Sequence, residues 1–522
     1  IGRPPEVPIL RSDLPFGEQT LADPTPATLY GAAKLIGNLG RRVTIGTLSA
    51  LQAPNAVPVL LLNRDRNQRV ASPLTLFNLL RMKVAVGSNA HIGLIATATN
   101  RFERPADYPI VPGSTGTPDL QLCPAGDLLA PGSACYHHGY VAGLDGRWRS
   151  PAGNYVLSGQ AIVTGTVGGP PRTMLDGTVV QSGDVAPGGY LYFGKEGGEH
   201  WVGSIEAEFA GRTLDYNDLG YMRRQNLFRV SAQLEYRTLK PWRNTLETHT
   251  RLEFFDRENL SFLNLARGYQ LNATWKLTNF WEFFVELHYR AAHFDDREVG
   301  DGTALEREGL VGFEVSVSSD KRRRVHGDLF VQNQVLFNGY NFALEGDITF
   351  RVLPQLDLQL LPQAVYTFGE PRYAGPGAQP GQYLFGRLLA KAVGGTLRAT
   401  YTFTPRLTLQ VYTQLLLGSK HYYDFSSLQS DPKGPRPAAR LRDLQPTAVP
   451  VANPDFVEPV MNLSAVLRWE YLPGSTLYLV YTRSQAPLPS FLPGQEANLD
   501  LGAFRVGPAS DALLIKFSYW FG

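Results

Sequence analysis

Residues 281–291, WEFFVELHYRA, alternate between charged and apolar side chains. Every second residue of an extended chain lies on the same face, so strict alternation is the sequence signal of a β-strand. The polar face carries Glu282, Glu286, His288 and Arg290, and the opposite face carries Phe283, Val285, Leu287 and Tyr289. A strand of this kind separates an aqueous phase from an apolar one.

The same alternation recurs along the chain. It is clear in residues 245–255 (TLETHTRLEFF), 341–351 (NFALEGDITFR) and 461–471 (MNLSAVLRWEY). We count twenty-one strand-like segments between residues 27 and 521. Residues 383–404 are interpreted as one long strand, because only then do short turns and long loops alternate. Most segments exceed about ten residues, whereas strands of soluble proteins average about five or six.

The composition limits the class of protein. Of the 522 residues, 18% are charged and 43% are hydrophobic, and the net charge is +2. The chain has no large excess of positive charge, so its composition gives no reason to expect a nucleic-acid partner. The 52 glycines and 38 prolines, against 4 methionines, are typical of many strands and turns. No apolar run approaches the roughly 18 residues of a membrane helix.

Long alternating strands fit either a transmembrane barrel or a soluble series of sandwiches or propeller blades. Full charges on the polar faces of many successive segments, without a convincing linker, favour the barrel. We therefore predict an all-β fold in which residues 27–522 form a transmembrane antiparallel β-barrel of about 22 strands. Residues 1–26 are rich in proline and predicted to be irregular. The wall would reach up to about 26 strands if further strands lie upstream.

The polar faces of these segments would line the interior of the barrel, here called the lumen. The predicted lumen residues are Glu247, His249, Arg251, Glu253, Glu282, Glu286, His288, Arg290, Asp347, Arg351, Arg468 and Lys516. Their mixed signs argue against strong selectivity for one ion. A hydrolase site at His249 and His288 is an alternative, but the sequence has neither a GxSxG nor an HExxH motif. We therefore expect that the chain has no catalytic residues and is not an enzyme.

Two further groups of residues suggest local chemistry. Cys123 and Cys135 share a stretch rich in proline and glycine, and a disulfide between them would suit an oxidising compartment, with two free thiols as the alternative. Asp215, Asn217 and Asp218 offer hard oxygen ligands that could bind calcium. The complete calcium-loop pattern is missing, and side-chain turns that satisfy the loop backbone are the favoured interpretation. We therefore expect no cofactor and no bound metal.

Several stretches together resemble one family. They include GKEGGEHW (194–201), LDYNDLGYMRR (214–224), RWEYLPGSTLYLVYT (468–482) and LLIKFSYWF (513–521). These stretches are similar to the C-terminal barrel of the outer-membrane family called domain of unknown function 5916, also known as carbohydrate-binding family 9 domain-containing proteins. The resemblance implies the barrel fold, the location and an upstream carbohydrate-binding-like domain as a partner. It implies no substrate.

Together these observations predict a multi-pass barrel in the outer membrane of a Gram-negative bacterium, in contact with membrane lipid. Its expected function is selective or gated passage of a solute or macromolecule. A barrel of about 22 strands usually needs a plug, so we expect loops such as residues 104–136 or 421–459, or a periplasmic or surface protein partner, to occlude the lumen. The alternative is a non-conducting scaffold for surface binding, secretion or assembly.

Overall fold

The computed structural model describes residues 10, 19–21, 28–60, 66–104, 107–114, 116–431, 434–450, 452–485, 491–492, 495–505 and 509–520. Over these ranges the regular elements are β-strands and short 3-10 helices such as η3 (Leu441–Asp443) and η4 (Leu501–Arg505). None of the helices in these ranges is long and apolar enough to cross a membrane. The predicted all-β fold is confirmed. Most of the predicted irregular segment, residues 1–26, lies outside the described residues.

The chain divides into two compact units. The first comprises residues 1–198, 203–232 and 256–264, and the second comprises residues 199–202, 233–255 and 265–522. Strands β17 (Leu227–Thr238) and β18 (Thr245–Glu258) contribute residues to both units.

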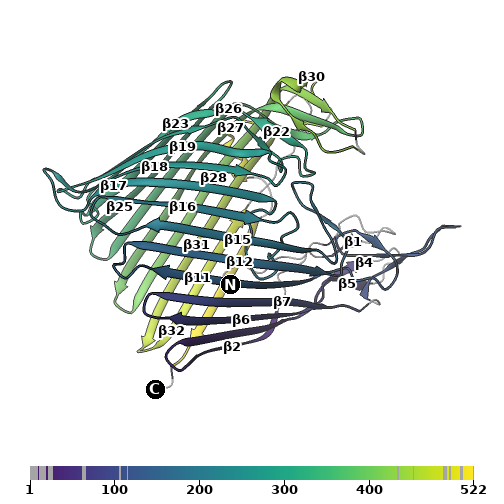
Figure 1. The fold of residues 1–522 in the computed structure, drawn as a ribbon, viewed down its shortest axis with the longest axis horizontal. Coiled ribbons are helices and arrows are strands. Elements are labelled where there is room, and N and C mark those ends of the chain that lie inside the picture. The colour runs from purple at the N-terminus through teal and green to yellow at the C-terminus, as the bar shows by residue number, and fades with distance from the viewer. Residues whose placement is uncertain are drawn as a thin grey trace. The chain divides into compact units, whose positions relative to one another are not determined.

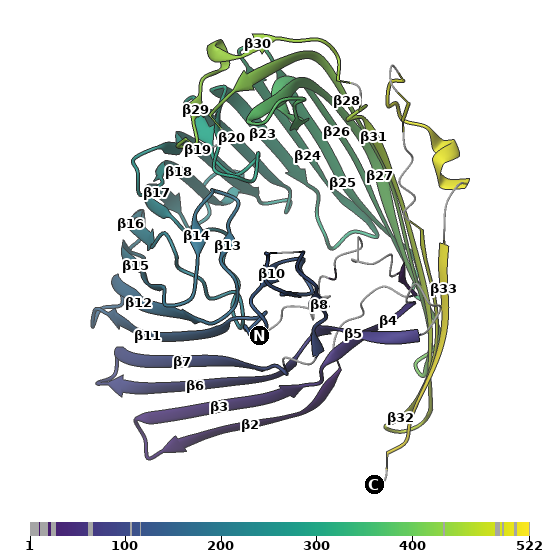
Figure 2. The same cartoon turned by 90° about the vertical axis from the view of Figure 1, so that its right-hand side faces the viewer.

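Long strands form an antiparallel sheet in the first unit, where each pairs with the next long strand along the chain (Figure 2). These strands are β2 (Leu29–Leu39), β3 (Val43–Gln52), β6 (Leu74–Val86), β7 (Ala90–Phe102), β11 (His138–Arg149), β12 (Tyr155–Val167), β15 (Val185–Lys195) and β16 (Trp201–Ala210).

The second unit repeats this arrangement with strands of 9 to 23 residues (Figure 1). They are β19 (Asn264–Leu277), β20 (Glu282–Arg290), β23 (Leu310–Ser318), β24 (Val325–Leu336), β25 (Tyr340–Leu353), β26 (Leu356–Pro376), β27 (Gln382–Thr404), β28 (Leu407–Gln429), β31 (Phe456–Leu472), β32 (Ser475–Gln485) and β33 (Ala509–Ser518). The single long strand predicted at residues 383–404 is β27. The antiparallel topology is confirmed, whereas closure into a membrane barrel of about 22 strands stays a prediction.

Loops that the sequence presents as connections contain short strands of their own. In the first unit these are β1 (Gln19–Thr20), β4 (Asn55–Leu60), β5 (Arg66–Ser72), β8 (Ile110–Val111), β9 (Leu120–Leu122), β10 (Leu128–Leu129), β13 (Arg172–Thr173) and β14 (Val179–Val180). In the second unit they are β21 (His293–Asp295), β22 (Ala304–Arg307), β29 (Ala438–Ala439) and β30 (Gln445–Pro446). Segments of two to seven residues are too short for a clear alternation, and their pairing depends on tertiary contacts.

Neighbouring strands of the second unit present one charged and one apolar face. In the register of β20 with β23, Glu286 lies opposite Glu314, whereas Leu287 lies opposite Phe313. The apolar side is exposed, since Leu287 is 54% and Val311 62% accessible. Water-soluble proteins rarely leave a contiguous apolar surface of this kind uncovered.

Candidate functional site

The predicted lumen residues lie on five strands, β18, β20, β25, β31 and β33. The structure does not bring all twelve into one cluster. Instead they form separate local contacts along the charged face of the second unit, and the lumen itself stays a prediction.

The contacts of β18 form the first of these groups. The Glu235 carboxylate, on β17, accepts hydrogen bonds from Arg251 at 2.6 and 3.0 Å and lies 2.9 Å from His249 Nδ1. Lys276 on β19 pairs with Glu247 at 3.1 Å. Glu235 is buried. It is not among the residues predicted from the sequence, although the alternation of residues 227–238 places it on the polar face of its strand.

A second group lies on β20 and β23. Potential ligand atoms of Glu286, His288 and Glu314 all lie within 4.8 Å of one another. Glu314 was also missed. It is the one charged residue in residues 310–318, LVGFEVSVS, so this segment lacks the alternating charges that mark the polar face of other strands. The imidazole of His288 contacts the side-chain amide of Gln334, with 3.2 Å between the two nitrogens.

Four further predicted residues, Asp347, Arg351, Arg468 and Lys516, make short-range contacts elsewhere. Asp347 accepts a hydrogen bond from Gln359 at 2.7 Å, and Arg351 lies 3.5 Å from Asp357. The other pairs are Arg468 with Glu470 at 3.2 Å and Lys516 with the ring of Tyr478 at 5.9 Å. These contacts lie on separate strands and do not make a single binding centre.

Two loops of the second unit fold together into a structure that we call the loop cap, residues 291–309 and 434–450. Its sheet orders β21, β22 and β29, and β22 pairs with β29 in parallel. Leu305 of β22 and Phe385 of β27 are fully buried in the apolar cluster beneath this sheet. The cap is therefore a packed element rather than an extended loop.

Buried ion pairs also hold the loop cap. Arg307 donates two hydrogen bonds of 2.6 Å to Glu370 and one of 2.5 Å to Glu298. Glu298 also accepts a hydrogen bond of 2.7 Å from Arg372. The side chains of Arg307, Glu298 and Glu370 are only 12%, 11% and 10% exposed, so none of the three charges is well solvated.

A cavity of about 970 Å³ lies in the second unit beside the loop cap. Its wall combines aromatic side chains, including Tyr422 and Tyr423, with polar groups. Asp455 fixes one side, because it accepts hydrogen bonds from the backbone of Tyr422 at 2.8 Å and of Ala497 at 3.0 Å, and lies 2.6 Å from His421 Nδ1. A cavity of this size with a mixed lining could hold a small molecule.

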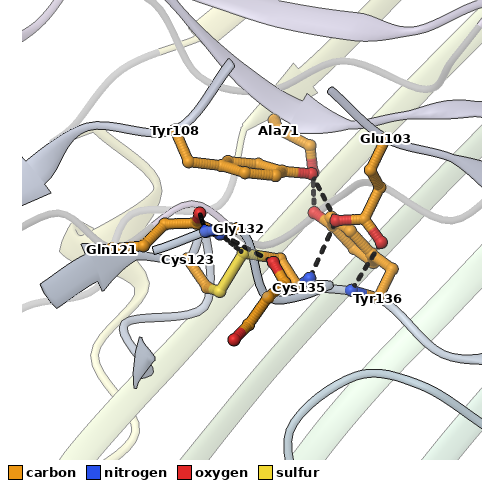
Figure 3. The surroundings of a disulfide bond; sticks show 9 residues. Ala71, Glu103, Tyr108, Gln121, Cys123, Gly132, Cys135 and Tyr136 are labelled. Atoms are coloured by element: carbon orange, nitrogen blue, oxygen red, sulfur yellow. Dashed lines mark hydrogen bonds between the residues drawn. A yellow bond between two sulfur atoms is a disulfide. The ribbon is translucent and has the colours of Figure 1, made fainter. Parts of the chain in front are cut away.

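The first unit contains a loop closed by a disulfide between Cys123 and Cys135 (Figure 3). The Glu103 carboxylate organises it by accepting hydrogen bonds from the backbone N–H groups of Cys135 and Tyr136 and from the Tyr108 hydroxyl, at 2.8 to 3.0 Å. Burial, together with the hydrogen bond to Glu103, raises the pKa of Tyr108 well above its usual range. The loop is thus a small folded element with a buried polar centre.

The proposed calcium ligands are occupied by contacts within the protein. Asp215 pairs with Arg172 at 3.0 Å and accepts a hydrogen bond of 3.1 Å from the backbone N–H of Asn217, which is a side-chain turn of the kind favoured from the sequence. Asp218 pairs with Arg101 at 2.6 Å and His137 at 3.3 Å. Burial raises the pKa of Asp218, but the hydrogen bond from His137 and the charge of Arg101 outweigh it and hold the pKa well below its usual range.

Comparisons with known proteins place the chain in a family. No curated protein matches the sequence. Among solved structures, the ferric enterobactin receptor of Pseudomonas aeruginosa matches twice, once as a point mutant in complex with enterobactin and once in complex with BCV-L6. In both cases the identity is 11%, the match covers 85% of this chain and 76% of the receptor, and the TM-score is 0.35, so the likeness carries no argument. The family described as domain of unknown function (DUF5916) matches residues 186–501, more than half of the chain, and the chain belongs to this family.

Proposed function

We propose that the strands of both units close into a β-barrel in the outer membrane of a Gram-negative bacterium, and that the barrel mediates selective, gated passage of a solute or macromolecule. The two-faced wall of the second unit carries this proposal. The same strands present exposed apolar side chains, such as Leu287 and Val311, on one side and charged side chains, such as Glu286, on the other. Lipid would contact the first face and water the second.

Strand length is compatible with membrane insertion. A tilted strand crosses the bilayer in about 9–11 residues, whereas β26, β27 and β28 have 21, 23 and 23 residues. The excess would project beyond the bilayer and carry the loop cap into the surrounding medium. A closed sheet is required because the hydrocarbon layer offers no partner for unpaired backbone groups.

Folded loops would provide the gate. An open barrel of about 22 strands would leave a wide channel, so passage needs an element that blocks it and can move. The loop cap suits this role, because the buried ion pairs of Arg307 join it to Glu370 of the long strand β26, and breaking these pairs would release the cap. A polar solute that competes for Arg307 or its carboxylate partners would loosen the cap. The solute would then pass along a wall on which some charges are paired, such as Arg251 with Glu235, while Glu286 and Glu314 lack an arginine or lysine partner among the described residues.

A non-conducting binding scaffold is the second candidate, and the cavity beside the loop cap favours it. A cavity with aromatic and polar walls could bind a ligand, or a segment of a periplasmic or surface protein, without any passage. The hydrolase alternative has less support. Among the described residues, His249 is hydrogen-bonded to Glu235 and His288 to Gln334, and neither contacts a hydroxyl or thiol nucleophile.

Current through planar lipid bilayers tests the proposal. The wild-type chain is compared with a variant in which residues 434–450 are replaced by a short glycine-serine linker. Gated passage predicts rare, small openings for the wild type and a larger, steadier current for the variant. The control is R442A, a change at an exposed residue of the same loop, which should leave the current at the wild-type level. If both inserted proteins carry no current, the scaffold function is favoured.

A further inference from the structure

Glu286, His288 and Glu314 bring two carboxylates and one imidazole together on two adjacent strands. Glu286 and Glu314 are direct partners in the register of β20 with β23, and His288 lies two residues further along the same face of β20. One potential ligand atom from each residue lies within 4.8 Å of the other two. This arrangement places three metal-binding groups around one point.

The two carboxylates lack a cationic partner. Among the described residues, neither Glu286 nor Glu314 forms an ion pair with an arginine or lysine. Within the group, His288 Nδ1 lies 3.5 Å from Glu286 Oε1. Glu235 on the same face is different, because Arg251 neutralises it at 2.6 Å. Adjacent carboxylates repel each other when both are ionised. A bound divalent cation would remove this repulsion.

His288 provides an independent indication of a ligand. Its side chain is only 8% exposed, and its Nδ1 atom has no hydrogen-bond partner among the described residues. The distance of 3.5 Å to Glu286 is too long for a good hydrogen bond. It is close to the roughly 3.3 Å that separates two ligand atoms on a tetrahedral ion with bonds of about 2.0–2.1 Å. The unpaired nitrogen therefore has both the freedom and the distance to share an ion with Glu286.

The surroundings fit this role for His288. Gly312 lies opposite His288, and a Cβ atom at Gly312 would lie 2.4 Å from His288 Nε2, so a glycine is needed for the imidazole to fit. When Nδ1 binds a metal, Nε2 carries the proton and needs an acceptor. A 180° rotation of the Gln334 side-chain amide would place its oxygen beside Nε2 as this acceptor. The side-chain amide of Asn341, which donates to the Gln334 oxygen at 3.3 Å, would then rotate as well. Gln332 similarly holds Glu314 by a hydrogen bond.

We propose that Glu286, His288 and Glu314 bind a divalent transition-metal ion, for which Zn²⁺ is the best match. One imidazole and two carboxylates suit such an ion, whereas calcium and magnesium take oxygen ligands. Three protein ligands leave one tetrahedral position for water or for an atom of a solute. The proposal goes beyond passage across the membrane and holds for a barrel that conducts nothing.

Metal titration of the full chain in detergent, purified with a tag that lacks histidine, tests this site. Zn²⁺ binding is measured by calorimetry, and Co²⁺ provides a visible absorption band that reports the ligand geometry. We expect one ion per chain in the wild type. H288Q and the double variant E286Q/E314Q should each bind at least about tenfold more weakly.

Two further variants separate ligand loss from misfolding. G312A removes no ligand, but its Cβ would press on His288 Nε2 and on the backbone oxygen of Asn333, so it should also weaken binding and change the Co²⁺ spectrum. H249Q removes an imidazole that is already paired with Glu235, and it should bind the metal as the wild type does. Circular dichroism and elution volume confirm that each variant is folded. The proposal is overturned if the wild type binds neither ion, or if folded H288Q and G312A bind Zn²⁺ as tightly as the wild type.

Discussion

Leu287 on β20 lies directly opposite Phe313 on β23, and both side chains are exposed, at 54% and 40%. The neighbouring register pair on the other face joins Glu286 to Glu314. One step along the strand therefore changes the surface from apolar to charged. This change is what a wall between lipid and water requires.

Replacing Leu287 by lysine should destabilise the inserted protein by about 2–4 kcal/mol if this side chain lies near the bilayer midplane. The cost arises because the ammonium group would lie in hydrocarbon. Chemical unfolding in lipid vesicles measures the change. The matched control is S316K, on the opposite face of β23, which should cost much less. Equal effects of the two substitutions would contradict the assignment of the faces.

Glu235 should influence ion selectivity if its face lines a lumen. E235Q removes the carboxylate that neutralises Arg251 and contacts His249, so the local charge becomes more positive. We expect the reversal potential in a salt gradient to shift toward anions. E199Q, which affects an exposed pair with Lys240, is the control and should cause no shift. An unchanged reversal potential for E235Q would show that Glu235 does not face the conduction path.

Arg307 should control the stability of the loop cap. R307A leaves Glu298 and Glu370 buried without their cation, and loss of one partner from a buried network costs about 3–5 kcal/mol. Hydrogen exchange of residues 291–309 should therefore accelerate strongly. The triple variant R307M/E298Q/E370Q removes all three charges together and should restore much of the protection. Protection of R307A at the wild-type level would mean that the cap depends on its apolar cluster alone.

The loop containing Asp218 should loosen in acid. The pKa of Asp218 lies below its usual value of about 3.9, so the folded state favours the ionised form. The stability from this group is complete above about pH 4 and is lost as the pH falls through the depressed pKa. Hydrogen exchange of residues 211–226, corrected for intrinsic rates, measures this. D218N should lose the response and be less protected at neutral pH. The prediction is contradicted if the wild-type loop is equally protected at neutral pH and at pH values well below that pKa.

Reduction of the disulfide should loosen one loop only. Cys123 and Cys135 are 12 residues apart, and closing a loop of about this length stabilises the folded state by roughly 3 kcal/mol in the chain-entropy account. The variant C123S/C135S should therefore be cut by proteases within residues 107–136, while the long strands stay intact. The single-site variant E103Q, which weakens the same element without breaking the covalent link, should have a smaller effect. Cleavage distributed over the whole chain would contradict a local role.

The long strands could be predicted from the sequence because each has enough residues to reveal a period of two. All twenty-one predicted segments coincide with strands of the structure, including the single long β27. The alternation also predicted that Glu286 and His288 lie on the same face of their strand. Contacts across strands were not, since the partnership of Glu286 with Glu314 depends on register, and register is set by pairing between distant segments.

The loops were less predictable for a physical reason. β29 has two residues and pairs with β22 only because a buried apolar cluster holds the two loops together. Nothing in the local sequence of Ala438 and Ala439 indicates a strand. The role of Gly312 was similarly hidden, because its small size matters only beside groups of other strands, the imidazole of His288 and the backbone oxygen of Asn333.

The parallel pairing of β22 with β29 also has a consequence for the order of folding. Ala304 and Ala438 are partners in that pairing, and β23 to β28 lie between them in the chain. During synthesis the hairpin of β21 and β22 is therefore complete before its third strand exists. During that interval Leu305 and the charges around Arg307 lack part of their cover. The loop cap would then form only after β28, and a truncation before residue 430 would leave a hairpin with an exposed apolar side that chaperones or proteases would recognise.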